Sequence, residues 1–147
     1  MNPTLHNGQC LVLLKKGFEI NRGDIIVANH SELGYIVKRV IACPGDTVEI
    51  RHSEVYVNGE KLREAYIAEP IWDSDCLEVT LADDQYFLMG DNRNNSADSR
   101  KYGCVSSNEI EGVIYLERQT LLFLSKMIII FSLIIALCIY LERKDAN

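Results

Sequence analysis

The sequence lacks the residue patterns that usually form metal sites or histidine-based catalytic sites. Its five cysteines include no C-x-x-C pair and no cluster with histidine at the spacing of zinc ligands. They are Cys10, Cys43, Cys76, Cys104 and Cys138. The three histidines, at positions 6, 30 and 52, have no aspartate or cysteine partner at a spacing typical of a catalytic triad or dyad. We therefore expect no metal ion and no cofactor, and we expect each histidine at the surface.

The sequence also lacks an excess of positive charge. Its 15 lysine and arginine residues stand against 21 aspartate and glutamate residues, which gives a formal net charge of −6. Phosphates repel a negatively charged chain, so this charge argues against a nucleic-acid partner. The length of 147 residues fits one ordinary domain, and 48% hydrophobic with 24% charged residues excludes both a disordered tail and a bundle embedded wholly in a membrane.

No hydrophobic segment stands near the start of the sequence, because residues 1–8 are polar. The long hydrophobic run lies at the other end, where residues 127–141 contain no charged residue. Extended back to Leu121, this run would form a helix of about 30 Å, the thickness of a bilayer's hydrocarbon core. The pattern predicts a transmembrane helix over residues 119–142 and a charged tail over residues 143–147. A buried core helix is the alternative, but the rest of the chain has too little apolar surface to enclose one.

The apolar runs between residues 8 and 116 are short and separated by turn residues, as in an all-β domain. Strands are predicted where β-branched and aromatic residues gather. These segments are residues 11–16, 24–28, 35–42, 47–51, 55–57, 76–81, 85–89 and 112–116. Many short strands favour a mostly antiparallel barrel or coiled sheet, and the predicted β-domain covers residues 1–118.

Two glycine-containing turns are indicated within this domain. Pro44–Gly45 fits a type II turn and Asn58–Gly59 fits a hairpin turn, and both are predicted to join antiparallel strands. Residues 63–74 show only weak patterning, which predicts an extended loop.

One lysine stands among apolar residues within a predicted strand. Alternation along residues 35–42 places Lys38 on the same face as Ile36, Val40 and Ala42. Desolvation lowers the pKa of a lysine, which would make Lys38 a usable general base. The alternative is an exposed lysine that deters pairing at a sheet edge, and the spacing by itself favours that alternative.

A dense polar segment, GDNRNNSADSRKYG, covers residues 90–103 after a predicted strand. It does not fit a calcium loop, because Arg93 is third counted from Asp91 and no glutamate is twelfth. Asp98 and Arg100 are two residues apart and are predicted to form an ion pair on one side of an extended segment. Asparagine and serine side chains fold such backbone locally, so we expect a rigid loop.

Four segments, taken in order, resemble the successive signature motifs of bacterial type I signal peptidases. They are residues 1–5 (MNPTL), 22–27 (RGDIIV), 37–46 (VKRVIACPGD) and 90–100 (GDNRNNSADSR). Four motifs in the right order make a specific match over about residues 1–113. The resemblance implies a membrane-anchored serine endopeptidase with a mostly antiparallel β catalytic domain outside the cytoplasmic membrane. It also implies removal of signal peptides from exported preproteins after small residues.

The resemblance carries roles to individual positions. Lys38 matches the family's general base, and Ser96 matches the serine that orients this base. Asp98 with Arg100, and Asp91 beside them, match residues that brace the site. Because the burial argument and the family role agree, the general-base interpretation of Lys38 replaces the exposed-lysine one.

The resemblance further implies a shallow apolar wall that admits an alanine-sized side chain of the substrate. This wall is expected to be formed by Met1, Pro3, Ile36 and Val37. The sequence departs from the family pattern at the nucleophile, whose position is the residue before Met1. The serines of the chain stand elsewhere relative to the motifs, so none is a natural substitute. The usual N-terminal anchor is missing as well, and we expect little or no peptidase activity from these 147 residues.

Three hypotheses follow. The first is a signal peptidase whose full protein chain begins upstream of Met1 and includes a serine and an anchor there. This accounts for both departures from the family pattern, and a genuine truncation would account for them as well. The second is a catalytically silent, membrane-tethered β-domain that binds extended or signal peptides by strand addition. The third, a self-cleaving repressor-type Ser/Lys peptidase, is disfavoured by the hydrophobic tail and the absence of a DNA-binding segment.

The first two hypotheses share their partners and their location. The partners are signal peptides of exported preproteins and the lipid bilayer. The location is the cell membrane of a bacterium, with the β-domain on the extracytoplasmic side. An even number of membrane spans would place both chain ends in the cytoplasm, where Arg143 and Lys144 fit.

Overall fold

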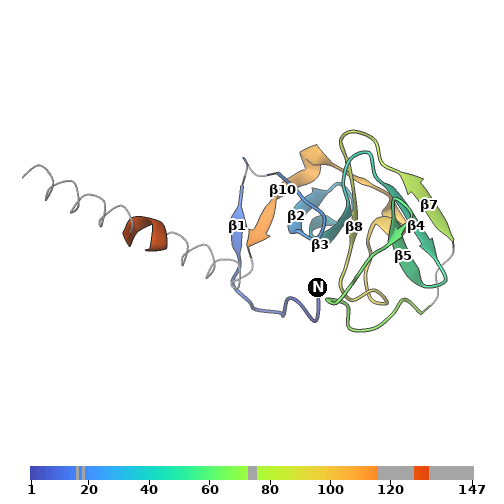
Figure 1. The fold of residues 1–147 in the computed structure, drawn as a ribbon, viewed down its shortest axis with the longest axis horizontal. Helices are drawn as coiled ribbons and strands as arrows, with labels where there is room; N and C mark the ends of the chain where they lie inside the picture. Colours follow the sequence, from blue (N-terminus) through green and yellow to red (C-terminus); the bar gives the residue numbers. More distant parts are fainter. Residues whose placement is uncertain (16, 18, 73–75, 116–127, 133–147) are drawn as a thin grey trace, which may run out of the picture. The chain divides into compact units, whose positions relative to one another are not determined.

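The computed structural model of this chain describes residues 1–15, 17, 19–72, 76–115 and 128–132. The chain divides into two compact units, Met1–Ile114 and Tyr115–Asn147. All strands of the described chain belong to the first unit except for the last residue of β10. Figure 1 shows its strands arranged as two sheets.

The first sheet has six strands in the spatial order β1-β10-β2-β3-β8-β9. Their bounds are β1 Val12–Leu14, β10 Ile110–Tyr115, β2 Ile25–His30, β3 Gly34–Ala42, β8 Gln85–Met89 and β9 Val105–Ser106. The second sheet has four strands in the order β6-β5-β4-β7. Their bounds are β6 Glu60–Lys61, β5 Glu54–Val57, β4 Thr47–Arg51 and β7 Leu77–Thr80. A short helix α1 (Ser99–Tyr102) and a 3-10 turn η1 (Ser107–Glu109) lie between β8 and β10.

The predicted all-β, mostly antiparallel class is confirmed for the described residues. Every predicted strand segment overlaps an observed strand, and each pairing described between strands is antiparallel. The sequence analysis missed β6 and β9, each of two residues, and the four-residue α1. Elements this short carry too little periodicity to be recognised.

Strand β3 connects the two halves of the core because of an irregularity near its end. It pairs with β2 on one side and with β8 on the other, and the register with β8 shifts between Val40 and Ala42. Val40 therefore packs in one hydrophobic cluster, whereas Ile41 and Ala42 pack in the other. The prediction that Ala42 shares a face with Val40 is wrong, because a bulge interrupts strict alternation.

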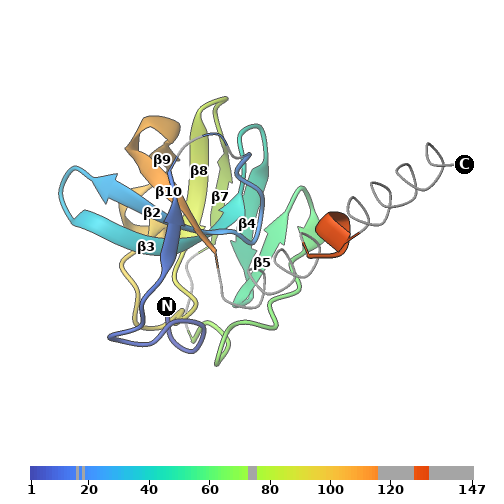
Figure 2. The same ribbon diagram turned by 90° about the vertical axis from the view of Figure 1, so that its left-hand side faces the viewer.

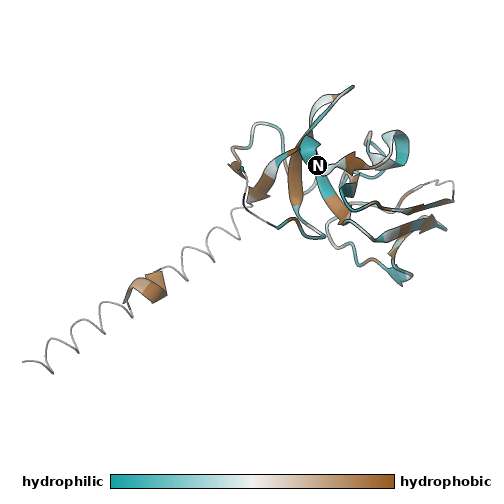
Figure 3. Cartoon of the chain, turned by 90° about the horizontal axis from the view of Figure 1, so that it is seen from above, coloured by the Kyte–Doolittle hydropathy of each residue, from teal (hydrophilic) through white to brown (hydrophobic). Residues whose placement is uncertain are grey.

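The core consists of two hydrophobic clusters of nearly solvent-free side chains, and Figure 3 shows the hydrophobic segments concentrated in the strands. The larger cluster consists of Ile41, Ala42, Val48, Ile50, Val55, Val57, Ile71, Leu81, Phe87 and Met89. The smaller cluster consists of Ile26, Ala28, Val40, Leu88, Val105 and Val113. Strand β8 contributes to both clusters from its two faces, so its end is rigidly held where the polar loop begins.

The two predicted turns differ in what they connect. Asn58 and Gly59 have φ values of 53° and 78° and join the antiparallel pair β5–β6, which confirms the hairpin. At Pro44–Gly45 the glycine has φ 82°, and the Asp46 N–H donates to the Cys43 carbonyl at 3.0 Å. This turn joins β3 to β4, which lie in different sheets, so the prediction that it joins an antiparallel pair is wrong. Residues 63–72 contain neither strand nor helix, as predicted.

In the part of the chain that is described, no helix is both long and apolar enough to cross a membrane. The predicted span over residues 119–142 lies outside the described residues except for 128–132. These five residues are helical. Residues 128–131 have exposed hydrophobic side chains, and the segment is coloured brown in Figure 3. The predicted tail over residues 143–147 also lies outside the described residues, as does Cys138.

Candidate active site

The site forms where the middle of β3 meets the polar loop that follows β8. Lys38 is half-buried on β3, opposite Ile26 of β2, and its Nζ donates a hydrogen bond to Ser96 Oγ at 2.9 Å. These two residues are 58 positions apart in the sequence. The structure thus brings together the side chains that the resemblance identified as base and orienting serine.

The surroundings of Lys38 favour its neutral form. Burial lowers the pKa of Lys38, and the neighbouring Arg100 cation lowers it further, whereas the Asp98 anion raises it. Desolvation is the largest effect, and the pKa of Lys38 lies below the ordinary value for lysine. A half-buried amine of this kind can accept a proton from a hydroxyl.

Gly90 makes the close approach of Ser96 and Lys38 possible. A Cβ at position 90 would lie 2.3 Å from Ser96 Oγ, 2.8 Å from Ser96 Cβ and 3.7 Å from Lys38 Nζ. No side chain larger than a hydrogen fits without displacing Ser96. The glycine that begins the polar segment is therefore required by packing against the site.

Asp98 anchors the far end of the polar loop. Its fully buried carboxylate accepts hydrogen bonds from the Gly90 N–H at 3.1 Å and from Arg100 Nε and Nη2, both at 2.8 Å. Burial by itself would raise the pKa of Asp98, but the hydrogen bonds and charge of Arg100, together with hydrogen bonds from the Gly90 N–H and from Ser96, outweigh burial and lower it. The predicted ion pair is present, but not on an extended segment: Asp98 caps α1, and Arg100 lies within that helix.

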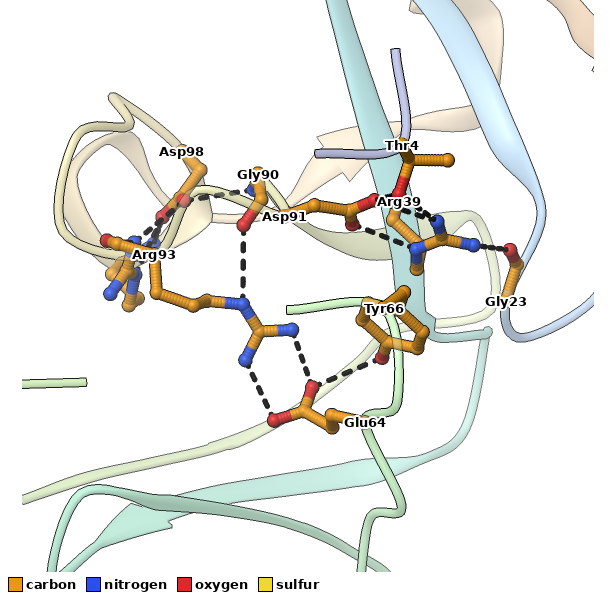
Figure 4. A network of polar contacts seen from close by, with 10 residues as sticks. Thr4, Gly23, Arg39, Glu64, Tyr66, Gly90, Asp91, Arg93 and Asp98 are labelled. Atoms are coloured by element: carbon orange, nitrogen blue, oxygen red, sulfur yellow. Dashed lines mark hydrogen bonds and ion pairs between the residues drawn. The ribbon is translucent and has the colours of Figure 1, made fainter. Parts of the chain in front are cut away.

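Asp91 ties the loop to β3 and to the N-terminal segment. It is fully buried and pairs with Arg39 through two hydrogen bonds, Nε to Oδ1 at 2.8 Å and Nη2 to Oδ2 at 2.7 Å (Figure 4). The Thr4 hydroxyl also donates to Asp91, and Arg39 Nη1 donates to the Gly23 carbonyl at 2.6 Å. Parts of all four motifs therefore meet around the pair formed by Arg39 and Asp91.

The residues expected to form the substrate wall lie in two places. Ile36 and Val37 are half-buried on β3, directly before Lys38. Met1 is half-buried and its carbonyl accepts a hydrogen bond from the Leu5 N–H at 3.0 Å, whereas Pro3 is exposed. Figure 2 shows the N-terminal segment at the same end of the β-domain as the loop after β8, in agreement with the bond between Thr4 and Asp91.

Three residues of the site were missed by the sequence analysis in any functional role: Glu64, Tyr66 and Arg93. The Arg93 side chain is fully buried and donates to Glu64 and to the Gly90 carbonyl (Figure 4). The Tyr66 hydroxyl donates to Glu64 at 3.0 Å. Glu64 and Tyr66 lie in the weakly patterned segment, where nothing local marks them, because their partners are far away in the sequence.

The second and third motifs meet in a separate polar cluster at the corner between the sheets. Arg22 Nε donates to Asp46 Oδ2 at 2.8 Å, and the same oxygen accepts from the Cys43 N–H at 2.8 Å. Asn58 Nδ2 completes the cluster with a bond to Asp46 Oδ1 at 3.0 Å. These contacts hold the turn between β3 and β4, so this cluster serves the fold rather than the site.

The histidines and cysteines lie away from Lys38. His6 and His52 are exposed as predicted, but His30 is half-buried with its ring 4.5 Å from that of Tyr102, because β2 ends against α1. Cys10, Cys43, Cys76 and Cys104 are free, so Cys76 and Cys104 do not pair. Within the described ranges, no three His, Cys, Asp or Glu side chains gather as metal ligands would.

The geometry thus places a partly desolvated lysine in contact with a serine within an antiparallel β-domain, as the resemblance to Ser/Lys peptidases implies. The chain belongs to the signal peptidase family, peptidase S26, whose family model matches residues 1–117. Enzymes of this family are serine endopeptidases that act on the signal peptides of preproteins. The fold, the site and the family therefore agree.

Individual relatives support this assignment. The chain is 40% identical over 127 residues to signal peptidase I S of Bacillus subtilis, with 76% of this chain and 68% of the relative covered. It is 43% identical over 124 residues to a probable signal peptidase I-1 of Synechocystis, with 76% and 63% covered. A crystal structure of a signal peptidase I from Enterococcus faecalis is similar with a TM-score of 0.60 and 32% identity, covering 67% of this chain and 98% of the other. The chain thus spans about two thirds of the curated relatives it matches.

Proposed function

We propose that this chain carries the catalytic domain of a type I signal peptidase, which cleaves signal peptides from exported preproteins after small residues. The observation that carries the proposal is the half-buried Lys38, hydrogen-bonded to Ser96 and with a lowered pKa. Only a neutral amine can act as a base, and the burial that lowers the pKa of Lys38 shifts its equilibrium towards that form.

The proposed reaction is acyl transfer through a serine. Neutral Lys38 accepts the proton of the serine hydroxyl as the serine oxygen forms a bond to the scissile carbonyl carbon. The resulting ammonium donates that proton to the leaving amine when the peptide bond breaks. Water then attacks the ester carbonyl carbon while Lys38 takes a proton from it, and the resulting ammonium returns that proton to the serine oxygen as the ester bond breaks and the acid product leaves. Ser96 holds Lys38 Nζ in place through the bond at 2.9 Å, and Asp98 with Arg100 braces the loop that carries Ser96.

We assign the nucleophile to a serine at the position directly before Met1, outside the 147 residues of the sequence. The hydrogen bond from Thr4 to Asp91 supports this assignment, because it holds the N-terminal segment against the strand that carries Lys38. Within the described part of the chain, Ser96 is the only serine hydroxyl bonded to Lys38. The 147 residues alone are therefore expected to bind substrate without the covalent step.

The substrate and membrane contacts are proposals of the same kind. Ile36 and Val37, with Met1 and Pro3, form the apolar wall for the small side chain before the scissile bond. The hydrophobic run over residues 119–142 spans the cytoplasmic membrane of a bacterium, with the β-domain on the extracytoplasmic side.

The experiment uses the native protein isolated from membranes. Its intact mass and N-terminal sequence identify the residue before Met1, and a preprotein in detergent or proteoliposomes reports cleavage. We expect a serine before Met1, and we expect Lys38→Met to lower kcat/KM by about 10⁴-fold. The matched control is Lys61→Met, because Lys61 is an exposed lysine on β6 of the other sheet, and it leaves cleavage unchanged.

Two results would reject the proposal. Normal cleavage by the Lys38→Met protein would exclude the lysine mechanism. Peptide binding without turnover, from a native protein whose first residue is Met1, would identify the chain as the silent peptide-binding domain instead.

A further inference from the structure

A ring of polar contacts joins six residues, of which two, Glu64 and Tyr66, lie outside the family motifs (Figure 4). The other four are Gly90, Asp91, Arg93 and Arg39. Glu64 is the centre of the ring. The Glu64 carboxylate accepts from Arg93 Nη1 at 2.9 Å, from Arg93 Nη2, and from the Tyr66 hydroxyl at 3.0 Å. Glu64 and Tyr66 thus connect the loop before Trp72 to the polar loop of the site.

The contacts of Arg93 lead to Ser96. Arg93 Nε donates to the Gly90 carbonyl at 3.1 Å, and the Arg93 carbonyl accepts from Arg100 Nη2 at 2.6 Å. Gly90 is the residue whose α-carbon leaves no room for a side chain beside Ser96. The fully buried Arg93 guanidinium therefore sets the position of the backbone against which Ser96 packs.

The contacts of Tyr66 lead to Lys38. The guanidinium carbon of Arg39 lies 4.0 Å from the centroid of the Tyr66 ring, as in a cation–π contact. Arg39 directly follows Lys38 on β3 and pairs with the buried Asp91, which directly follows Gly90. The ring of contacts therefore passes through Gly90 and Asp91, which lie beside Ser96, and through Arg39, which follows Lys38 in the sequence.

We propose that Glu64 and Tyr66 are positioning residues that, through Arg93 and Arg39, hold Lys38 and Ser96 in hydrogen-bonding contact. The proposal rests on the proposed function, since it concerns the base of that reaction. Glu64 neutralises the buried Arg93, which would otherwise be an unpaired charge pulled towards water. A shift of about 1 Å in the Gly90 backbone is enough to separate groups that must be 2.9 Å apart.

A cluster with the same chemistry on the other sheet provides a matched control. The Tyr56 hydroxyl donates to Glu54 at 2.8 Å, Lys61 pairs with Glu54, and Arg51 lies 4.3 Å from the centre of the Tyr56 ring. As in the first cluster, the tyrosine lies two positions after its glutamate. No hydrogen bond or ion pair described for these residues reaches the loop that carries Ser96.

The experiment measures the pKa of Lys38 by NMR in the 147-residue chain, with lysine labelled at Cε and the signal assigned by its loss in Lys38→Met. We expect a value below that of ordinary lysine in the wild-type chain. Both Tyr66→Phe and Glu64→Gln are expected to raise it by about one unit, because a loosened loop admits water to the amine. The charged neighbours Asp98 and Arg100 are retained in both variants, and Tyr66→Phe also changes no charge, so the change in Tyr66→Phe reports solvent access. Tyr56→Phe and Glu54→Gln are expected to leave it unchanged.

Cleavage of a preprotein by the native protein provides a second measurement. Tyr66→Phe is expected to lower kcat about tenfold at neutral pH with little change in KM, and higher pH should restore part of the rate. Tyr66→Phe removes one oxygen and keeps the ring on Arg39, so it remains informative if Glu64→Gln fails to fold. Thermal unfolding shows whether each variant is folded.

The outcomes separate the two proposals. An ordinary lysine pKa for Lys38 in the wild-type chain overturns the proposed function and this inference together. A lowered wild-type value that Tyr66→Phe leaves unchanged overturns this inference alone. Equal pKa changes in Tyr66→Phe and in its control Tyr56→Phe would also overturn it, because the effect would then come from general loosening of the fold.

Discussion

At the scale of single residues, two atoms decide what the site can do: the Nζ of Lys38 and the Oγ of Ser96. Both belong to half-buried side chains, and a hydrogen bond of 2.9 Å joins them. Their contact depends on the missing side chain at position 90. The absence of a side chain at Gly90 is therefore needed for the hydrogen bond between Lys38 and Ser96.

The first prediction concerns Gly90→Ala. The added Cβ would stand 2.3 Å from Ser96 Oγ, so Ser96 must move and its bond to Lys38 is lost. We expect kcat/KM of the native protein to fall about 100-fold, while the folded state remains, because Gly90 lies in a loop. The control is the same change in a Ser96→Gly background, where the contacts with both Oγ and Cβ are gone. If Gly90→Ala costs as much in that background, the effect does not pass through Ser96.

At the scale of elements, the loop after β8 is organised by two buried aspartates at its ends. Asp91 faces Arg39 and Thr4, and Asp98 faces Arg100 and the Gly90 N–H. The negative charge of each buried carboxylate is paired with an arginine. Removing one partner leaves an unpaired buried charge, so it lowers the free energy of unfolding by more than the ion pair adds to it. The loop is therefore rigid for an electrostatic reason, although it contains little regular structure.

The second prediction concerns the pH dependence that Asp98 gives to stability. Its pKa is lowered in the folded chain, since Arg100, the Gly90 N–H and Ser96 together outweigh burial. Its stabilisation is therefore complete above the unfolded pKa of about 3.9 and is lost as pH falls through the folded value. Asp98→Asn should cost about 3 kcal/mol at pH 7. As the pH decreases below about 4, the free energy of unfolding of the Asp98→Asn variant should also fall less than that of the wild type.

Urea unfolding at several pH values measures this difference. The control is Asp83→Asn, because Asp83 is exposed, and it should change stability at pH 7 by less than about 0.5 kcal/mol. A wild type and an Asp98→Asn variant with parallel pH curves would contradict the assignment of this pH dependence to Asp98.

The third prediction concerns the tether of the N-terminal segment. Thr4→Val keeps the shape of the side chain but removes the hydroxyl that donates to Asp91. We expect a loss of about 1 kcal/mol in stability and faster hydrogen exchange of the Leu5 N–H, which closes the turn onto Met1. Thr80→Val is the control, since Thr80 is an exposed threonine bonded only to Thr47. Unchanged exchange at Leu5 would show that the hydroxyl does not hold this segment.

At the scale of the whole molecule, the chain consists of a β-unit, Met1–Ile114, and a C-terminal unit, Tyr115–Asn147. The first contains all residues of the candidate site. The second contains the uncharged run over residues 127–141. Two exposed free cysteines, Cys10 and Cys76, lie in the first unit and can report the side of the membrane on which it resides.

The fourth prediction uses these cysteines. In intact bacterial protoplasts, a membrane-impermeant maleimide should label the native protein at Cys10 and Cys76, because the β-domain is proposed to lie outside. The double variant Cys10→Ser with Cys76→Ser should lose most of the label, since Cys43 and Cys104 are partly buried. Labelling only after the membrane is permeabilised would reject the extracytoplasmic location. Release of the protein by alkaline carbonate would reject the membrane span.

Local sequence patterns predicted most of the strands, but they predicted less of how the strands assemble into sheets. The strands around Lys38 and the hairpin at Asn58–Gly59 follow from residue types that act within a few positions. The bulge in β3 and the corner at Pro44–Gly45 did not follow, because each depends on which sheet the next strand joins. The half-buried place of His30 against Tyr102 escaped prediction for the same reason.

The sequence by itself determined the all-β class and the family, and through the family resemblance it singled out Lys38 as the proposed base, because motif residues at set spacings carry that information. It also identified Ser96, Asp98 and Arg100 as the surroundings of Lys38, through the family resemblance. Only the tertiary structure decided that Glu64 and Tyr66 reach the site and that Gly90 must be a glycine. The physical reason is distance along the chain. Arg93 and Glu64 are separated by 29 positions, and only packing of the two sheets determines which distant charges meet in a dry interior.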